Sequence, residues 1–144
     1  MTKKEFLNSL YKECDLSKED VFENTRQRYT IITRSGIEKI QSKYDIQATF
    51  ELSVCNINQV VVKGRFTKPN TPKESAKFIE TFGEWNDTHA NYKTDKQTGI
   101  KQMLPFYSVA LAEKRCLSRG VLKIMGLYKY GVFGEDETMY ETYE

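Results

Sequence analysis

The stretch from Leu104 to Leu127 restricts the fold more than any other part of the sequence. Pro105 suits the first position of a helix, because the N–H that proline lacks would have no partner there. Gly126 follows the last residue of the apolar pattern and can adopt the left-handed conformation that ends a helix. The apolar residues between them recur at helical spacing, which predicts a long amphipathic helix. The face predicted to be buried comprises Phe106, Val109, Ala110, Cys116, Leu117, Gly120, Val121 and Ile124.

The charged residues of this helix lead to two expectations. Arg115, Arg119 and Lys123 are four positions apart and should form one basic stripe, with Lys114 beside it. Such a stripe is either the solvated back of a core helix or a contact surface for a polyanion. Glu113 is expected to project from the apolar face and to need a basic partner, since a lone buried carboxylate is costly.

Three segments before this helix have the patterns of strands. Residues 48–55 alternate, and the face predicted to be apolar consists of Ala48, Phe50, Leu52 and Val54. Residues 60–67 place Lys63 and Arg65 on the face opposite the apolar one. Residues 76–86 place two phenylalanines and two glutamates on one face, and end at Trp85 and Asn86, where the tryptophan is expected in the core. Short connections favour an antiparallel meander, because parallel neighbours need a long crossover.

The beginning of the chain adds helical segments. Thr2 and Glu5 form a capping box for an amphipathic N-terminal helix, and a second capping box at Ser35 predicts a short helix that ends near Lys43. The predicted fold is therefore α+β, an antiparallel β-meander (a β-β-β-α core) packed against one long helix, with an N-terminal helix.

The segment from Asn86 to Met103 contains hardly any apolar residues, and loops of this length are usually functional or disordered. Tyr92 precedes Lys93, and Lys96 and Lys101 follow. Aromatic and basic residues interleaved on a loop suit a single strand of nucleic acid, because bases stack on rings while cations follow phosphates. The alternative is a plain disordered loop.

Charge divides the 144-residue chain into two parts. Five of the 20 acidic residues lie in the last ten positions, which contain no lysine or arginine. The rest of the chain therefore has more basic residues (all 22 lysines and arginines) than acidic ones. We expect one domain over residues 1–134 and an acidic tail over residues 135–144, which could compete with a polyanion or recruit a partner protein. The chain has no membrane-length apolar run and no signal-peptide pattern, and its three cysteines (Cys14, Cys55 and Cys116) look like reduced core residues, so a cytoplasmic protein is predicted.

Several pieces of the sequence resemble one protein family. The segment 112–123 (AEKRCLSRGVLK) is similar to the helix that follows a β-meander in phage and bacterial single-strand annealing proteins of the Rad fifty-two superfamily, the Red-beta and Erf-like recombination mediators. Residues 60–64 (VVVKG), 80–84 (ETFGE) and 131–137 (GVFGEDE) occur in the order typical of this family, so the resemblance covers roughly residues 29 to 137. The chain is short for an annealing protein.

The resemblance implies binding of single-stranded DNA and annealing of complementary strands in phage-type recombination and repair, without ATP and without a cofactor or metal. It also implies a homo-oligomer, either a ring or a helical filament. The residues predicted to contact nucleic acid are Lys63, Arg65, Tyr92, Lys93, Lys96, Lys101, Lys114, Arg115, Arg119 and Lys123. The alternatives are a phage accessory or interaction protein with the same fold, and a metal-dependent nuclease.

Signals for catalysis are weak. His89 is the one histidine and has no Cys or His near it in sequence, so a metal site or a histidine-dependent triad has little support. No P-loop motif is present. Glu80, Glu84 and Glu113 are carboxylates that could converge in a nuclease, but the usual nuclease pattern of a strand carboxylate followed two residues later by lysine is absent.

Overall fold

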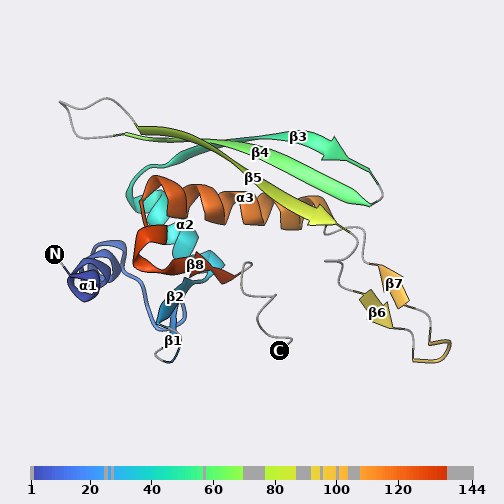
Figure 1. Cartoon of the computed structure of the whole chain (residues 1–144), viewed down its shortest axis with the longest axis horizontal. Coiled ribbons are helices and arrows are strands. Elements are labelled where there is room, and N and C mark those ends of the chain that lie inside the picture. The colour runs from blue at the N-terminus through green and yellow to red at the C-terminus, as the bar shows by residue number, and fades with distance from the viewer. Residues whose placement is uncertain are drawn as a thin grey trace.

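The computed structural model describes residues 2–24, 26, 28–56, 58–69, 77–86, 92–94, 96–99, 101–103 and 108–135. In this part of the chain, helices and sheets form the mixed α+β fold that the sequence predicts (Figure 1). The helices are α1 (Lys3–Cys14), α2 (Arg34–Lys43), α3 (Ser108–Ile124) and the 3-10 helix η3 (Tyr128–Tyr130). The strands are β1 (Val21–Asn24), β2 (Tyr29–Ile32), β3 (Gln47–Cys55), β4 (Gln59–Lys68), β5 (Lys77–Asn86), β6 (Tyr92–Thr94), β7 (Lys101–Met103) and β8 (Val132–Gly134).

The predicted meander is confirmed. Strands β3, β4 and β5 form an antiparallel sheet in that order, and α3 packs along one of its faces (Figure 1). In β4 the alternation has the predicted sense, with Val60, Val62 and Phe66 buried against the helix side. Trp85 at the end of β5 is also buried, as expected. We call the face of this sheet toward α3 the inner face and the opposite face the outer face.

The inner face approaches α3 so closely that glycine is required at the contact. A Cβ atom at Gly83 would lie 2.0 Å from the Ala112 carbonyl oxygen and 2.4 Å from the Cys116 backbone nitrogen. A Cβ atom at Gly120 of the helix would lie 2.1 Å from the ring of Phe66. Because two of these neighbours are helix backbone, a side chain at Gly83 could be accommodated only if α3 moved away from the sheet.

Strand β3 departs from the prediction in two ways. A bulge between Leu52 and Val54 shifts the register. Val54 therefore pairs with Val61, a residue of the outer face, and does not lie on the inner face as predicted. Phe50 and Leu52 do lie on the inner face, but they are 38% and 53% exposed, because α3 contacts mainly β4 and β5 and leaves this part of β3 uncovered. Cys55, predicted as a core residue, is exposed for the same reason.

Helix α3 is confirmed over Ser108–Ile124, and the left-handed φ of +67° at Gly126 ends it as predicted. Cys116 and Val121 of the predicted apolar face are fully buried. The prediction that Val109 and Ala110 belong to the buried face is wrong, because both residues, in the first turn of α3, are exposed. Glu113 is exposed too, so it does not project into the core. Pro105 and Phe106 lie outside the described residues.

The N-terminal helix α1 has the predicted capping box. The backbone N–H of Glu5 donates to the Thr2 hydroxyl, and the Thr2 N–H donates to the Glu5 carboxylate. Helix α2 begins earlier than predicted: Thr33, and not Ser35, is its N-cap, because the Thr33 hydroxyl accepts a hydrogen bond from the Gly36 N–H. The N-terminal half therefore starts each helix with a threonine cap.

A second sheet joins the two ends of the described chain. Strand β1 pairs antiparallel with β2, and β2 pairs parallel with β8, with Thr30 opposite Val132. In Figure 1, α3 lies between this sheet and the meander. Neither β1 nor β8 was predicted as a strand, since both are short. The sheet places α1 and the β1–β2 turn on the far side of α3 from the meander.

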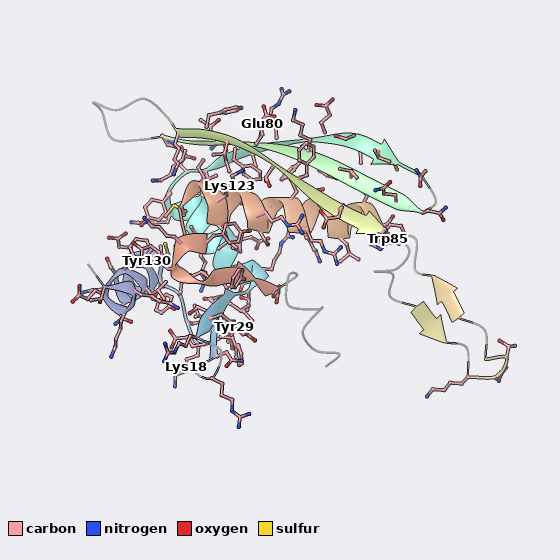
Figure 2. All side chains as sticks on the ribbon, in the orientation of Figure 1. Lys18, Tyr29, Glu80, Trp85, Lys123 and Tyr130 are labelled. Carbon is pink, nitrogen blue, oxygen red and sulfur yellow. The ribbon has the colours of Figure 1, made fainter. Side chains whose placement is uncertain are left out.

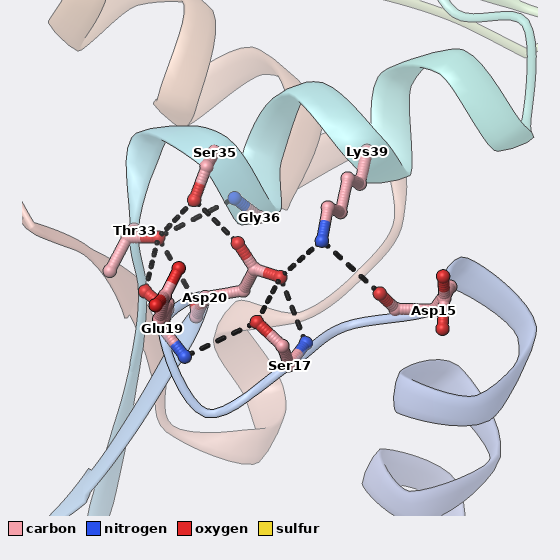
Figure 3. Close-up of polar contacts among 8 residues, drawn as sticks. All are labelled: Asp15, Ser17, Glu19, Asp20, Thr33, Ser35, Gly36 and Lys39. Carbon is pink, nitrogen blue, oxygen red and sulfur yellow. Dashed lines mark hydrogen bonds and ion pairs between the residues drawn. The ribbon is translucent and has the colours of Figure 1, made fainter.

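A buried carboxylate, Asp20, ties α2 to the segment that precedes β1 (Figure 3). It accepts hydrogen bonds from the Lys39 ammonium at 2.7 Å, the Ser17 N–H at 2.8 Å and the Ser35 hydroxyl. Burial by itself disfavours the charge, but the bonds from Lys39, Ser35 and Ser17 outweigh it and hold the pKa of Asp20 well below its usual value. All of these partners are structural, so we assign Asp20 a role in positioning α2.

The first residue of the predicted acidic tail returns to the body. The Glu135 carboxylate accepts a hydrogen bond from the Arg34 backbone N–H at 2.9 Å, at the N-terminus of α2, where a negative charge is favourable. Residues 136–144 lie outside the described residues, so the rest of the tail stays a prediction. No described helix combines the length and the hydrophobicity that crossing a membrane requires.

Candidate nucleic-acid interface

The outer face of the meander carries aromatic and basic side chains together. Register places Lys63 of β4 opposite Phe82 of β5, Arg65 opposite Glu80, and Thr67 opposite Phe78. We call the set Lys63, Arg65, Phe78, Glu80 and Phe82 the strand platform. Figure 2 shows Glu80 on the side of the meander that faces away from α3. The platform is therefore an open surface on regular strands, which hold side chains more rigidly than a loop does.

Two phenylalanine rings of the platform are solvent-exposed. Phe78 is 57% and Phe82 49% exposed, although both are large apolar residues. They are four residues apart on one strand, which corresponds to about 13 Å at roughly 3.3 Å per residue. Alternation in a strand puts both rings on the same face, and Glu80 lies between them. Exposed rings at this spacing offer flat surfaces on which planar groups can stack.

The charges of the platform are paired with one another. The Lys63 ammonium lies 2.9 Å from one oxygen of the Glu80 carboxylate, and the Arg65 guanidinium lies 3.7 Å from the other. The adjacent Lys63 ammonium, more than Arg65, holds the pKa of the Glu80 carboxyl below its ordinary value. Ion pairs at an exposed surface contribute little net stability, so a competing anion can replace Glu80 at low cost.

The structure corrects the predicted basic stripe on α3. Arg115 is only 3% exposed and donates to the Glu84 carbonyl oxygen at 2.7 Å. Arg119 donates to the Phe82 carbonyl oxygen at 3.0 Å and binds the Glu84 carboxylate with two nitrogens, at 2.5 and 2.9 Å. Both guanidinium groups therefore fasten α3 to β5. They belong to the helix–sheet contact and not to an open basic surface.

The other two predicted binding residues of α3 lie outside the contact between α3 and β5. Lys114 and Lys123 are exposed on α3. They are nine positions apart, so without the two arginines they do not form a continuous stripe. A different lysine serves the end of the helix: Lys77 of β5 donates to the Ile124 carbonyl oxygen at 2.9 Å and caps the C-terminus of α3.

The segment expected to be one long irregular loop contains a hairpin. Strands β6 and β7 pair antiparallel, with Tyr92 opposite Met103, Lys93 opposite Gln102, and Thr94 opposite Lys101. Lys96 is exposed in the turn between them. The side chains of Tyr92, Lys93 and Lys101 lie outside what the structure describes, so their predicted contact with nucleic acid stays a prediction.

Three residues of the platform, Phe78, Glu80 and Phe82, were not predicted as binding residues. The alternation in 78–84 had placed Phe78, Glu80, Phe82 and Glu84 on one face, yet the phenylalanines were not singled out. The signal was available, because a strand face that mixes aromatic rings with carboxylates is unsuited to a core. It indicates a face of the sheet that is exposed to solvent, with aromatic side chains that do not pack in the core.

The carboxylates considered for a nuclease are not assembled. Glu80 pairs with Lys63 and Glu84 with Arg119, while Glu113 is exposed on α3. Among the described residues, no three histidine, cysteine, aspartate or glutamate side chains lie close enough to hold a metal ion. The described side chains of the platform are exposed aromatic rings and ion-paired charges.

The chain matches no protein-family model, no curated protein and no solved structure in the comparisons with known proteins.

Proposed function

We propose that this chain binds single-stranded DNA on the strand platform and anneals complementary strands without ATP. The observation that carries the proposal is the exposure of Phe78 and Phe82 on the same sheet face as Lys63 and Arg65. Sheets that bind single strands use this combination, because bases stack on the rings while cations neutralise the phosphates.

The geometry supports a single strand more than a duplex. Bases in a duplex are stacked on one another, so their flat surfaces are not accessible to Phe78 and Phe82. An unpaired strand exposes them, and stacking on an aromatic ring is tolerant of sequence because every base has a flat face. This tolerance suits annealing, in which a protein must hold strands of any sequence.

Glu80 determines how tightly the platform holds a phosphate. It occupies Lys63 and Arg65 when no ligand is bound, so the DNA backbone has to replace its carboxylate. A cost of this kind weakens binding, and weak binding lets strands exchange until a complementary pair forms. The carboxylate is therefore part of the proposed activity.

Oligomerisation and location follow from the same proposal. Self-association into a ring or filament remains a prediction, and the exposed Phe50 and Leu52 of β3 supply an apolar surface for it. A protein that anneals phage-type recombination intermediates would work in the cytoplasm of the host cell. A phage accessory protein with the same fold is the second candidate, favoured by the Glu80 carboxylate that already pairs with both cations of the platform.

The test is a binding and annealing assay with matched phenylalanine variants. We expect Phe78→Ala and Phe82→Ala each to cost about 1–3 kcal/mol of affinity for a fluorescent single strand, through lost stacking. Phe22→Ala is the control, because Phe22 is 56% exposed on β1 in the other sheet. Affinity of the parent protein should fall with salt, with a slope of roughly −0.7 per phosphate contacted.

The outcomes separate the two candidates. Binding that is lost on substitution in the platform but kept in Phe22→Ala, together with strand annealing by the parent, supports the proposal. Absence of DNA binding at low salt rejects it and favours the accessory protein. Binding without annealing of complementary oligonucleotides would reject the annealing part alone. An RNA strand of the same sequence measures the preference between the two nucleic acids.

A further inference from the structure

A pocket on the far side of the molecule from the strand platform has three cationic residues among the nine that line it. It lies between α1 and the β1–β2 hairpin and has a volume of about 340 Å³. Figure 2 shows Tyr29, one of its lining residues, on the opposite side of α3 from Glu80 of the platform. The polar lining consists of Lys3, Lys4, Asn8, Glu23, Asn24, Arg28, Tyr29 and Thr30, and Leu7 adds an apolar wall.

The charges of this lining do not cancel. Lys3, Lys4 and Arg28 supply three positive charges, against the single carboxylate of Glu23. Among the described residues, no ion pair links Glu23 to any of these cations. Glu23 instead accepts a hydrogen bond from the Tyr11 hydroxyl at 3.1 Å. The pocket therefore has a net excess of two positive charges.

A hydrogen bond ties two of the three cationic residues, Lys3 and Arg28, to each other. The Lys3 ammonium donates to the Arg28 carbonyl oxygen at 3.1 Å and so joins the start of α1 to the turn between β1 and β2. Arg28 has a left-handed φ of 58°, which is uncommon for a residue with a side chain. The next residue but one, Thr30, is held by its N–H bond to the Gly131 carbonyl oxygen at 2.9 Å. The Lys3 ammonium and the backbone at Arg28 are thus fixed relative to each other, and β2 is fixed to the segment that contains Gly131.

We propose that this pocket binds a phosphate group carried by a small molecule, of the class of phosphomonoesters such as nucleoside monophosphates. A phosphomonoester carries close to two negative charges at neutral pH, which matches the excess charge of the lining. Lysine and arginine donate strong charge-assisted hydrogen bonds to phosphate oxygens. Asn8 and Asn24 add amide groups, and Leu7 and Tyr29 border the space where an attached ring would lie.

The size of the pocket agrees with this class. A volume of about 340 Å³ is at the lower end of the range of small-molecule sites, roughly 300–1,000 Å³. The site is independent of the strand platform, since it shares no residue with it. A failure of DNA binding would leave this inference untouched, and the reverse also holds.

The experiment is isothermal titration calorimetry on the full chain with three probes: inorganic phosphate, adenosine monophosphate and adenosine. The double variant Lys4→Gln with Arg28→Gln removes two cations of the lining. The control, Lys12→Gln with Lys43→Gln, removes two exposed lysines that do not line the pocket. We expect the first variant to weaken binding of the phosphate probes about tenfold or more, and the control to change it by less than about twofold.

Each result decides the inference. Binding of adenosine monophosphate tighter than inorganic phosphate, and lost in the first variant, supports a nucleotide ligand. Equal binding of both supports a site for phosphate itself. The inference is overturned if neither phosphate probe binds, if adenosine binds as well as its monophosphate, or if both variants weaken binding equally. Circular dichroism of each variant verifies that it is folded, and the Phe82→Ala protein should retain full phosphate binding.

Discussion

The two faces of the β3–β4–β5 sheet use adjacent residues of the same strands for opposite purposes. On the inner face, Gly83 has no room for a Cβ atom because the backbone of α3 is in contact with it. On the outer face, its neighbour Phe82 is half exposed and no described element covers it. Over β4 and β5 the inner face is therefore closed by packing, and the outer face is left open.

The basic residues differ in the same way. Arg115 and Arg119 belong to the closed side, where they satisfy carbonyl oxygens and a carboxylate of β5. Lys63 and Arg65 lie on the open side, where their ion pairs within the described part of the chain are with the exposed Glu80. The environment of a cation, and not its spacing along a helix, therefore determines whether it is available to a ligand.

The largest expected effect is on the closed face. Gly83→Ala should reduce the free energy of unfolding by about 3 kcal/mol or more, because its Cβ atom can be accommodated only if α3 shifts. Urea denaturation of the purified protein measures it. Thr49→Ala, on the exposed outer face of β3, is the control and should change stability by less than about 0.5 kcal/mol. Similar stability of both variants would contradict the close contact of helix and sheet.

The next effect concerns the arginine that proved to be buried. Arg115→Ala should destabilise the fold by about 2 kcal/mol, because the Glu84 carbonyl oxygen loses its donor. Lys114→Ala, at the exposed neighbouring position, should have almost no effect on stability. Thermal and urea unfolding compare the two, with single-strand affinity measured in parallel. A stable Arg115→Ala protein that no longer binds DNA would show that Arg115 is a DNA contact after all.

The smallest effect concerns the open face. Glu80→Gln should strengthen binding of single-stranded DNA about two- to fivefold, because the DNA backbone no longer competes with a carboxylate for Lys63 and Arg65. Lys63 holds the pKa of Glu80 below its ordinary value, so the carboxylate stays charged at neutral pH. The ratio of the DNA affinity of Glu80→Gln to that of the parent protein should therefore be the same at pH 6 and pH 8. It should approach one only when the pH falls through that lowered pKa and Glu80 takes up a proton.

The opposite effect of Glu80→Gln on DNA affinity would give Glu80 a different role. If Glu80 instead holds Lys63 and Arg65 in the orientation that binding requires, Glu80→Gln will weaken affinity. Glu51→Gln is the matched control, since Glu51 is exposed on the same face, opposite Lys63, and forms no ion pair with another described residue. Fluorescence anisotropy at two salt concentrations distinguishes a local effect of Glu80 from a general effect of net charge.

Local sequence patterns predicted the features that depend on contacts between residues close in the sequence. The alternation in β4, the capping box of Thr2 and Glu5, and the helix end at Gly126 were all confirmed, because each depends on residues a few positions apart. The short strands β1 and β8 were missed, since each acquires its hydrogen bonds only by pairing with β2. The bulge in β3 was missed for a similar reason, as it concerns the register between two strands.

The order of the longer elements (α1, α2, β3, β4, β5 and α3) and the apolar face of β4 were predictable from the sequence, because side-chain alternation and helical spacing are local properties. The element that covers each sheet face depends on tertiary packing and was not predictable from these local patterns. Helix α3 lies over β4 and β5, so Trp85 is buried while Leu52 on the same face of β3 is exposed. The same placement brings Arg115 onto the edge of β5 and removes it from solvent. Periodicity cannot report the lateral position of a helix on a sheet, because that position depends on side-chain volume at contacts far apart in the chain.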